Sequence, residues 1–345
     1  MNNIFEKFIL LFKKYYLGEE AYPLHNNTNL KLNNYMYSLH SGGSKNKNEI
    51  FYIIQRSPGA GLFSNLIFVL NHLKIAEKHK FTSFIDMQNF PTIYNEPKSI
   101  DGTKNSWEYF FHQTSNKSAI EVKKSKNIIT TSNIFYKDFT SNPKKLRKIF
   151  KKKIKIKKKY LKVVKLYYDK NIKGNKVLAI HYRGTSYKTS AGHPLPPTLK
   201  QMNYIIDKFI LKKKFDKIFL CTEDKKMFNQ LKKRYSKKII SIKSYRSLSD
   251  DAFKIYPRKN HRYKLGKEIL IEALIMSKCD SLLSTETNVS NFIKIINGNN
   301  KSNFYRIENS YNSTNEYYAM WIWYLKKILP KFFFGFGSTL NYSKH

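Results

Sequence analysis

Cysteine is scarce in this chain of 345 residues: there are two, Cys221 and Cys279, and both lie within apolar runs. Two cysteines exclude a disulfide scaffold and a zinc site built from several thiolates. We therefore interpret both as small buried hydrophobic side chains, and this sparse usage fits a reducing compartment.

Acidic residues are also few, with 24 Asp and Glu against 64 Lys and Arg, and the formal net charge is +40. Such a charge attracts polyanions and anionic membrane surfaces. Eight of the 64 basic residues are arginine, however, and Asn and Ile are abundant, so a coding bias towards Lys, Asn and Ile is the simpler explanation. The few arginines then mark positions where lysine would not serve as well.

The sequence lacks both a long apolar run that would span a bilayer and a signal-peptide cleavage site. Residues 4–17 form a short amphipathic stretch that contains Glu6 and Lys7. We expect a cytoplasmic protein, and peripheral contact with an anionic membrane through this stretch or through the aromatic C-terminal tail is an open alternative to ordinary packing.

Strands alternate with helical patterns of ten or more residues over most of the chain, which is typical of parallel α/β sheets. We predict a GT-B-like α/β fold with two Rossmann-like, doubly wound domains facing a cleft. Residues 1–48 would be an amphipathic and flexible lead-in, and a linker would lie at 171–175. The domains would span 49–172 and 173–304, and a helix with an aromatic tail at 305–345 would pack back on the first domain.

The first domain opens with a strand over 50–55, a turn with Gly59 and Gly61, and an apolar helix over 62–78. Strand, glycine turn and helix form the first half of a βαβ unit. The two glycines fall short of a full dinucleotide fingerprint, so a tight turn is the plainer interpretation. Gly61 and Asn65, one turn into the helix, are still candidates to face an acceptor or a cleft.

The most informative motif follows the apolar strand Val177–Ile180 and reads His181-Tyr-Arg183-Gly-Thr185. The carboxyl end of a buried strand is where α/β proteins bind anions. Arg183 offers a planar fork of donors that matches phosphate, and Gly184 lacks the Cβ that would keep a ligand from the backbone. The alternative is a plain turn with a solvated arginine.

Two more polar loops follow strands of the second domain, Thr222-Glu223-Asp224 and Ser284-Thr285-Glu286-Thr287-Asn288. The latter leads into a helix whose first N–H groups favour anions. Because parallel strands end at one edge of a sheet, we expect both loops beside the arginine motif. One arginine, several hydroxyls and a helix N-terminus suit a diphosphate. Arg183 could neutralise the diphosphate, so we expect no metal and no other cofactor.

These motifs resemble those of the fucosyltransferases that include α-1,6-fucosyltransferases, rhizobial nodulation fucosyltransferases and protein O-fucosyltransferases. His181-Tyr-Arg183-Gly-Thr185 is similar to their His-x-Arg motif. The resemblance covers residues 50–80 and 176–296. Its further blocks are Gly59-Ala-Gly61 to Asn65, His193-Pro194, His261-Arg-Tyr263, Glu268-Ile-Leu-Ile-Glu272, Ser277-Lys-Cys-Asp280 and Leu282-Leu-Ser-Thr-Glu-Thr-Asn288.

The resemblance implies an inverting, metal-independent glycosyltransferase that moves fucose from GDP-fucose to a glycan or another hydroxyl acceptor. Arg183 would be the catalytic residue that neutralises the departing diphosphate. His181 and Glu272 would face the nucleoside, since a carboxylate can accept two parallel hydrogen bonds from guanine. Further donor-site candidates are Gly184, Thr185, Ser284, Thr285, Thr287 and Asn288, and His193 joins Gly61 and Asn65 on the acceptor or cleft side.

The chain departs from the family pattern at Ser186, where relatives commonly carry Asp, and at Glu272, which replaces Asp. No acidic residue near 190–193 matches the base suggested for the α-1,6 enzymes. The catalytic base is therefore open, and the leaving phosphate could itself take the proton. The candidate side chains are Glu223, Asp224, Glu286 and His193.

Two other functions compete with this one. The nearest is a transferase that uses another GDP-hexose. The other, from a different class, is a non-catalytic lysine-rich protein that binds polyanions or membranes. Binding of a specific nucleic acid is not expected.

Overall fold

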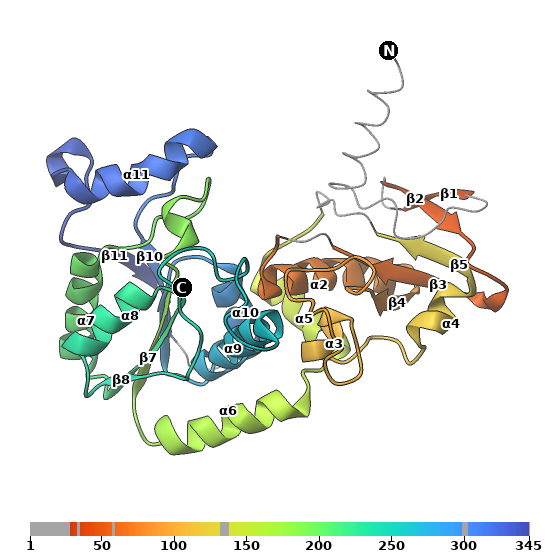
Figure 1. The fold of residues 1–345 in the computed structure, drawn as a ribbon, viewed down its shortest axis with the longest axis horizontal. Coiled ribbons are helices and arrows are strands. Elements are labelled where there is room, and N and C mark those ends of the chain that lie inside the picture. Colours follow the sequence, from red (N-terminus) through yellow and green to blue (C-terminus); the bar gives the residue numbers. More distant parts are fainter. Residues whose placement is uncertain (1–27, 33–34, 57–58, 132–137, 299–302, 345) are drawn as a thin grey trace, which may run out of the picture. The chain divides into compact units, whose positions relative to one another are not determined.

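The computed structural model describes residues 28–32, 35–56, 59–131, 138–298 and 303–344 (Figure 1). The chain divides into two compact units. Unit 1 comprises Met1–Lys157 with Arg258–Lys267, and unit 2 comprises Lys158–Pro257 with Glu268–His345. Each unit is built around one sheet.

The sheet of unit 1 has five strands in the order β1-β2-β5-β3-β4. β3 pairs in parallel with both β4 and β5, whereas β2 pairs antiparallel with β5 and β1 pairs antiparallel with β2. The bounds are β1 Thr28–Leu32, β2 Tyr35–His40, β3 Lys45–Ile54, β4 Thr82–Ile85 and β5 Ser125–Thr130.

Residues 28–48 thus differ from the flexible lead-in that we expected, because they hold two strands and the start of β3. Leu39 and His40 pair with Ile129 and Ile128 of β5, a partner almost 90 residues away that the local Asn-rich composition does not reveal. The predicted amphipathic stretch 4–17 lies outside the described residues.

Helix α2, Leu62–Lys78, is confirmed at the predicted bounds. Gly61 is its N-cap, and the Leu62 N–H donates to the Tyr94 hydroxyl at 2.8 Å. Most of its side chains are buried, so this helix is held by packing on nearly every face. The other helices of unit 1 are α3 Ser106–Phe110, α4 Ala119–Lys123 and α5 Pro143–Lys153.

The first residues of α9, His261–Met276, belong to unit 1, although we expected 173–304 to form one domain. The Tyr263 N–H donates to Glu96 at 2.8 Å, and its ring stacks on Phe110. Gly266 is needed in this packing, because a Cβ there would lie 2.4 Å from the Phe110 ring. Local sequence carries no sign of so distant a partner.

The sheet of unit 2 has six strands in the order β11-β10-β9-β6-β7-β8. All neighbours are parallel except β10 and β11. Its bounds are β6 Val177–Tyr182, β7 Lys217–Thr222, β8 Ile239–Ile240, β9 Ser281–Ser284, β10 Asn303–Glu308 and β11 Asn341–Lys344. Counted from β6, the parallel strands follow the order 3-2-1-4-5 of the dinucleotide-binding fold, which confirms the predicted Rossmann-like architecture.

Most of the remaining helices of unit 2 begin with side-chain caps that the sequence supplies. Thr198 and Gln201 form a capping box at α7, Asp224 caps α8, and Thr287 forms a capping box with Ser290 at α10. The bounds are α6 Lys158–Asn171, α7 Leu199–Lys213, α8 Lys225–Arg234, α10 Asn288–Asn297 and α11 Glu316–Ile328.

The tail and the linker differ from our expectations. β10 and β11 extend the unit 2 sheet, and Tyr305 and Tyr342 pack edge-on against Phe209 of α7. Residues 303–308 and 341–344 therefore complete the sheet of unit 2, whereas we expected 305–345 to pack on the first domain. The division falls at Lys157, before α6, and not at 171–175. Within the described residues no helix is long and apolar enough to cross a membrane.

Candidate functional site

The carboxyl ends of β6 and β9 meet where the strand order of unit 2 reverses. His181 is the register partner of Ser284 on one side and of Cys221 on the other. Crevices at such reversals are the usual ligand sites of open α/β sheets. The structure therefore brings the three predicted polar loops to one edge of one sheet.

His181 is a buried and neutral member of this edge. Its ring is 3% exposed, and burial lowers its pKa to about 3, with the charge of Arg183 as the second cause. Its Nδ1 lies 3.4 Å from the Thr287 hydroxyl. An uncharged imidazole hydrogen-bonded across the switch point can orient a ligand without adding charge.

Arg183 carries donors that the protein leaves largely unused. Its Nη2 donates to the Ser186 hydroxyl over a long 3.4 Å, and its buried Nε has no acceptor among the described residues. The guanidinium lies over the Tyr187 ring at 5.0 Å. The contact with the ring helps to hold the guanidinium in place, and the donors that lack protein acceptors could serve an anion.

Tyr187 was missed by the sequence analysis, although it stands four residues after Arg183. Its ring stacks on the His193 ring with centroids 4.4 Å apart, so Tyr187 contacts both Arg183 and His193. The pKa of His193 is lowered by desolvation and then by the Arg183 charge. His193 thus joins the site through a ring contact, a signal that spacing alone does not give.

The backbone donors of Gly184 and Thr185 are engaged by a carboxylate. Glu223 Oε1, at the end of β7, accepts from the Gly184 N–H at 3.0 Å, the Thr185 N–H at 3.2 Å and the Thr185 hydroxyl at 3.1 Å. Gly184 is required at this turn, because a Cβ would lie 2.1 Å from the Tyr182 ring and 2.8 Å from Asp224. The loop is therefore an anion-binding turn whose amides a protein carboxylate occupies.

The two other acidic candidates are also committed to neighbours. Asp224 caps α8 and forms an ion pair with Lys188 at 3.0 Å. Glu286 is exposed and pairs with Arg306 at 2.9 Å. These contacts hold the loops in place.

Glu272 is a buried carboxylate beside the same edge. Its two oxygens accept from the Ser244 hydroxyl at 2.7 Å and from the Cys221 thiol at 3.2 Å, and Arg246 lies 4.0 Å away. Burial raises its pKa to about 7, although these partners oppose the rise. The sequence predicts Glu272 as a site residue but not its partners, because Ser244 and Arg246 come from an irregular loop.

The turn after β9 is built by its own hydroxyls. The Thr287 hydroxyl accepts from the Ser290 N–H at 3.1 Å, and the Thr287 N–H donates to the Ser290 hydroxyl at 3.0 Å. Ser284 and Thr285 are buried beside this cap, whereas Asn288 is exposed. The predicted donor residues 284–288 thus share one turn, with Asn288 on its outside.

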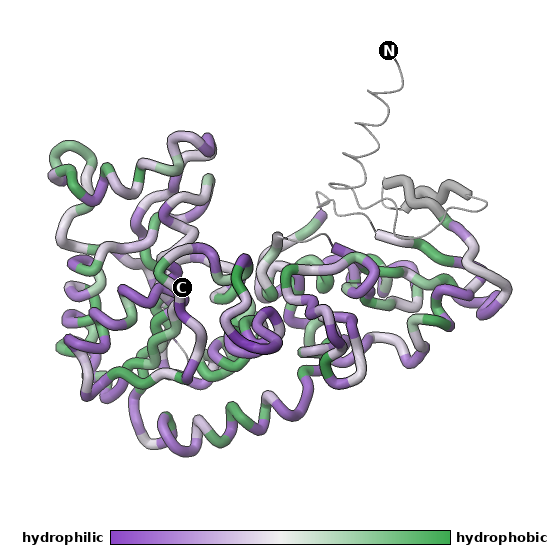
Figure 2. Tube along the Cα trace, viewed as in Figure 1, coloured by the Kyte–Doolittle hydropathy of each residue, from purple (hydrophilic) through white to green (hydrophobic). Residues whose placement is uncertain are grey.

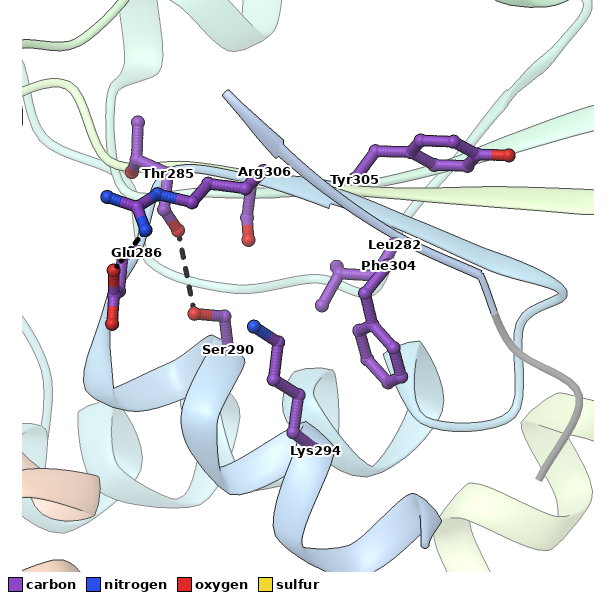
Figure 3. A pocket seen from close by; sticks show the side chains of 9 residues that line it. Leu282, Thr285, Glu286, Ser290, Lys294, Phe304, Tyr305 and Arg306 are labelled. Carbon is purple, nitrogen blue, oxygen red and sulfur yellow. Dashed lines mark hydrogen bonds and ion pairs between the residues drawn. The ribbon is translucent and has the colours of Figure 1, made fainter. Parts of the chain in front are cut away.

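A small pocket opens beside this turn, between α10 and the ends of β9 and β10 (Figure 3). The Lys294 ammonium lies beside Ser290, and Arg306 extends from β10 towards Glu286. Both cations fall where the sequence analysis assigned no site residue. The lining residues are Leu282, Ser284, Thr285, Glu286, Ser290, Lys294, Phe304, Tyr305 and Arg306.

In unit 1 the predicted residues Gly61 and Asn65 lie at the carboxyl end of β3. Asn65 is buried; its Nδ2 donates to the Ala60 carbonyl at 3.4 Å, and its Oδ1 has no donor among the described residues. Gln55, which was not predicted from the sequence, is also buried. Neither its Nε2 nor its Oε1 has a hydrogen-bond partner among the described residues. Burial lowers the pKa of the neighbouring Arg56 to about 10. Unit 1 thus has its own polar cluster at the strand end that corresponds to Arg183 in unit 2.

No group of three or more His, Cys, Asp or Glu side chains within the described part of the chain is placed to hold a metal ion. The predicted burial of both cysteines is confirmed.

Comparison with known proteins gives a match in structure alone. No family model matches the sequence, and no curated protein matches it. The α-1,6-fucosyltransferase NodZ soaked with GDP-fucose superposes with a TM-score of 0.51 at 13% identity, over 75% of this chain and 94% of that one. NodZ co-crystallized with GDP gives 0.50 at 13% identity, over 76% and 96%. Fucosyltransferase NodZ from Bradyrhizobium gives 0.50 at 13% identity, over 75% and 96%. The chain therefore has the GT-B-like α/β fold of solved fucosyltransferases, as the resemblance of its motifs predicted.

Proposed function

We propose that this protein is an inverting glycosyltransferase that transfers fucose from GDP-fucose to a hydroxyl of a glycan or another acceptor, without a metal ion. The observation that carries the proposal is Arg183, a stacked guanidinium with unused donors at the topological switch point of a Rossmann-like sheet. The fold is that of NodZ, which was solved with GDP and with GDP-fucose.

In the proposed reaction the acceptor oxygen bonds to the anomeric carbon while the bond from that carbon to the diphosphate breaks. Negative charge then develops on the diphosphate. Arg183 would face this charge, and one such preorganised donor is typically worth about 3–4 kcal/mol of barrier. The proton of the acceptor passes either to a side chain or to the leaving phosphate.

Glu272 would recognise the guanine base. A carboxylate offers about four lone-pair sites, and two are used by Ser244 and Cys221. Two remain for parallel N–H groups of guanine. Recognition would need the ionised form, so GDP affinity should rise as the pH passes the pKa of Glu272, about 7. The Thr285–Thr287 turn would lie near the phosphates or the ribose.

Thermal unfolding in the presence of nucleotides tests the donor. GDP should raise the unfolding temperature, with and without a chelator, whereas ADP and UDP should not. A panel of GDP- and UDP-sugars then identifies the sugar through hydrolysis or transfer. If GDP gives no stabilisation at millimolar concentration, the proposal fails.

Arg183→Lys tests the mechanism. Lysine keeps the charge and loses the fork, so turnover should fall by roughly a hundredfold to a thousandfold, the typical effect of one oxyanion donor. The matched control is Arg234→Lys on α8, whose partner Asp207 forms an exposed ion pair. Equal turnover in the two variants would show that Arg183 does not stabilise the charge on the departing diphosphate.

A further inference from the structure

Helix α11 is apolar on two opposite faces. Its inner face buries Ala319 and Trp323. The Trp323 indole donates to the Pro196 carbonyl at 2.8 Å, and the Asn312 amide donates to the Ala319 carbonyl at 3.0 Å. These contacts attach the helix firmly to unit 2 along one side only.

The outer face carries large apolar side chains at spacings of four, three and four residues, which form one stripe on a helix. Tyr317 is 82% exposed, Trp321 64%, Tyr324 48% and Ile328 77%. A contiguous apolar face that stays exposed on a packed helix typically marks a site of interaction with a partner or a membrane.

The segment after the helix continues this surface. Phe332 is 87% exposed and Phe334 83%, and the Phe334 backbone takes a left-handed conformation that ends the short helix η3, Lys331–Phe333. Figure 2 shows this loop as a hydrophobic segment beyond α11. We name the six residues together the tail surface: Tyr317, Trp321, Tyr324, Ile328, Phe332 and Phe334.

The charges around the tail surface are mostly positive. Lys326, Lys327 and Lys331 lie within it or beside it, and Glu316 is the only acidic residue from 309 to 345. Helices that lie in a membrane interface have a similar composition. Their lysines, Tyr and Trp lie at the level of the lipid headgroups, and their Phe and Ile side chains reach deeper. A carbohydrate-binding surface is the alternative, but it would need polar groups beside its aromatic rings, and the side chains of Ile328, Phe332 and Phe334 offer none.

We propose that the tail surface docks unit 2 on an anionic lipid bilayer. The helix would lie in the interface, with its aromatic stripe towards the acyl chains and its lysines towards anionic headgroups. This inference goes beyond the proposed transferase activity and does not depend on it.

The docking helix is joined to the segment that follows Arg183. The Lys188 ammonium lies 5.0 Å from the Trp323 ring while it pairs with Asp224, and the Asn312 amide also donates to the Ser190 carbonyl at 3.2 Å. A bilayer bound at α11 would therefore hold the candidate donor site close to the membrane surface. Acceptors presented at that surface would then be within reach of unit 2.

Vesicle binding tests the proposal with the full chain. Phosphatidylcholine vesicles, alone and mixed with an equal part of phosphatidylglycerol, are floated with the protein, and tryptophan emission is recorded. We expect binding to the anionic vesicles with a blue shift of the emission. Trp321→Phe should remove most of the shift, because Trp107 and Trp323 are already buried.

Two variants separate the apolar and charged parts. Trp321→Ser with Phe332→Ser should reduce binding by more than tenfold, and Lys327→Gln with Lys331→Gln should reduce it by roughly fivefold for each lysine. Matched controls on unit 2 are Leu211→Ser with Leu248→Ser, which are equally exposed, and Lys225→Gln with Lys226→Gln. Unfolding temperatures confirm that each variant is folded.

Three outcomes would overturn the proposal. The protein could fail to bind either kind of vesicle. The tail variants and the controls could bind equally, which would assign binding to the general positive charge. Sedimentation could also show a dimer that the tail variants dissociate, which would make a second copy the occupant of the tail surface.

Discussion

The ionisation of Glu272 should make the folding stability of the protein depend on pH. Burial raises its pKa from 4.5 to about 7, while Ser244, Cys221 and Arg246 lower it and Glu268 raises it slightly. Each pKa unit corresponds to ~1.4 kcal/mol, so the ionised folded form is disfavoured by about 3 kcal/mol. Between pH 4.5 and 7 the unfolded chain has lost this proton and the folded chain keeps it. Stability should therefore fall as the pH rises through this window and should level off above it.

Glu272→Gln removes this dependence. Urea denaturation of the variant and the wild type at pH 5 and pH 8 should show that the stability of the variant, relative to the wild type, rises by about 2–3 kcal/mol over that interval. Comparing the two proteins cancels the other titrating groups that both share. Glu308→Gln, at an exposed position on β10, is the control and should show no such change. An equal difference at both pH values would refute the buried, mostly protonated Glu272.

The remaining predictions concern the two turns of the site. Gly184→Ala should destabilise the fold by about 1–3 kcal/mol in urea denaturation, because its Cβ would press on the Tyr182 ring and on Asp224; unchanged stability would show that the loop yields easily. Thr287→Ala should cost about 1 kcal/mol through the lost cap of α10, whereas Thr287→Ser should retain most of it. If the serine variant loses as much as alanine, the methyl group and not the hydroxyl is what matters.

Local pattern was sufficient for much of the second unit. The strand 177–182 was expected within two residues, because an apolar run defines it locally. The meeting of the loops after β6 and β9 also followed, since parallel strands end at the same edge. The helix 62–78 was predicted for the same reason, from a glycine turn and an apolar run.

Long-range partners explain what local pattern missed. β2 is a strand because β5 pairs with it, and His261–Lys267 joins unit 1 because Tyr263 and Gly266 fit against Phe110. The contact of Arg246 with Glu272 joins an irregular loop to a helix 26 residues later. Neither composition nor periodicity encodes such a pairing, so the sequence predicted the carboxylate and left out the groups that set its pKa.

The hydrogen bonds of Glu223 make it a poor candidate for the catalytic base of the proposed reaction, which is still unassigned. One of its oxygens accepts three hydrogen bonds from Gly184 and Thr185, so using this carboxylate as a base would loosen the turn that carries Arg183. Asp224 is constrained in the same way by its cap and by Lys188. A residue that holds the loop is poorly suited to move a proton, because each protonation would cost contacts that orient Arg183, the residue proposed to face the leaving group. In the proposed reaction, proton transfer to the departing phosphate, or to His193 beside Tyr187, would keep those contacts intact.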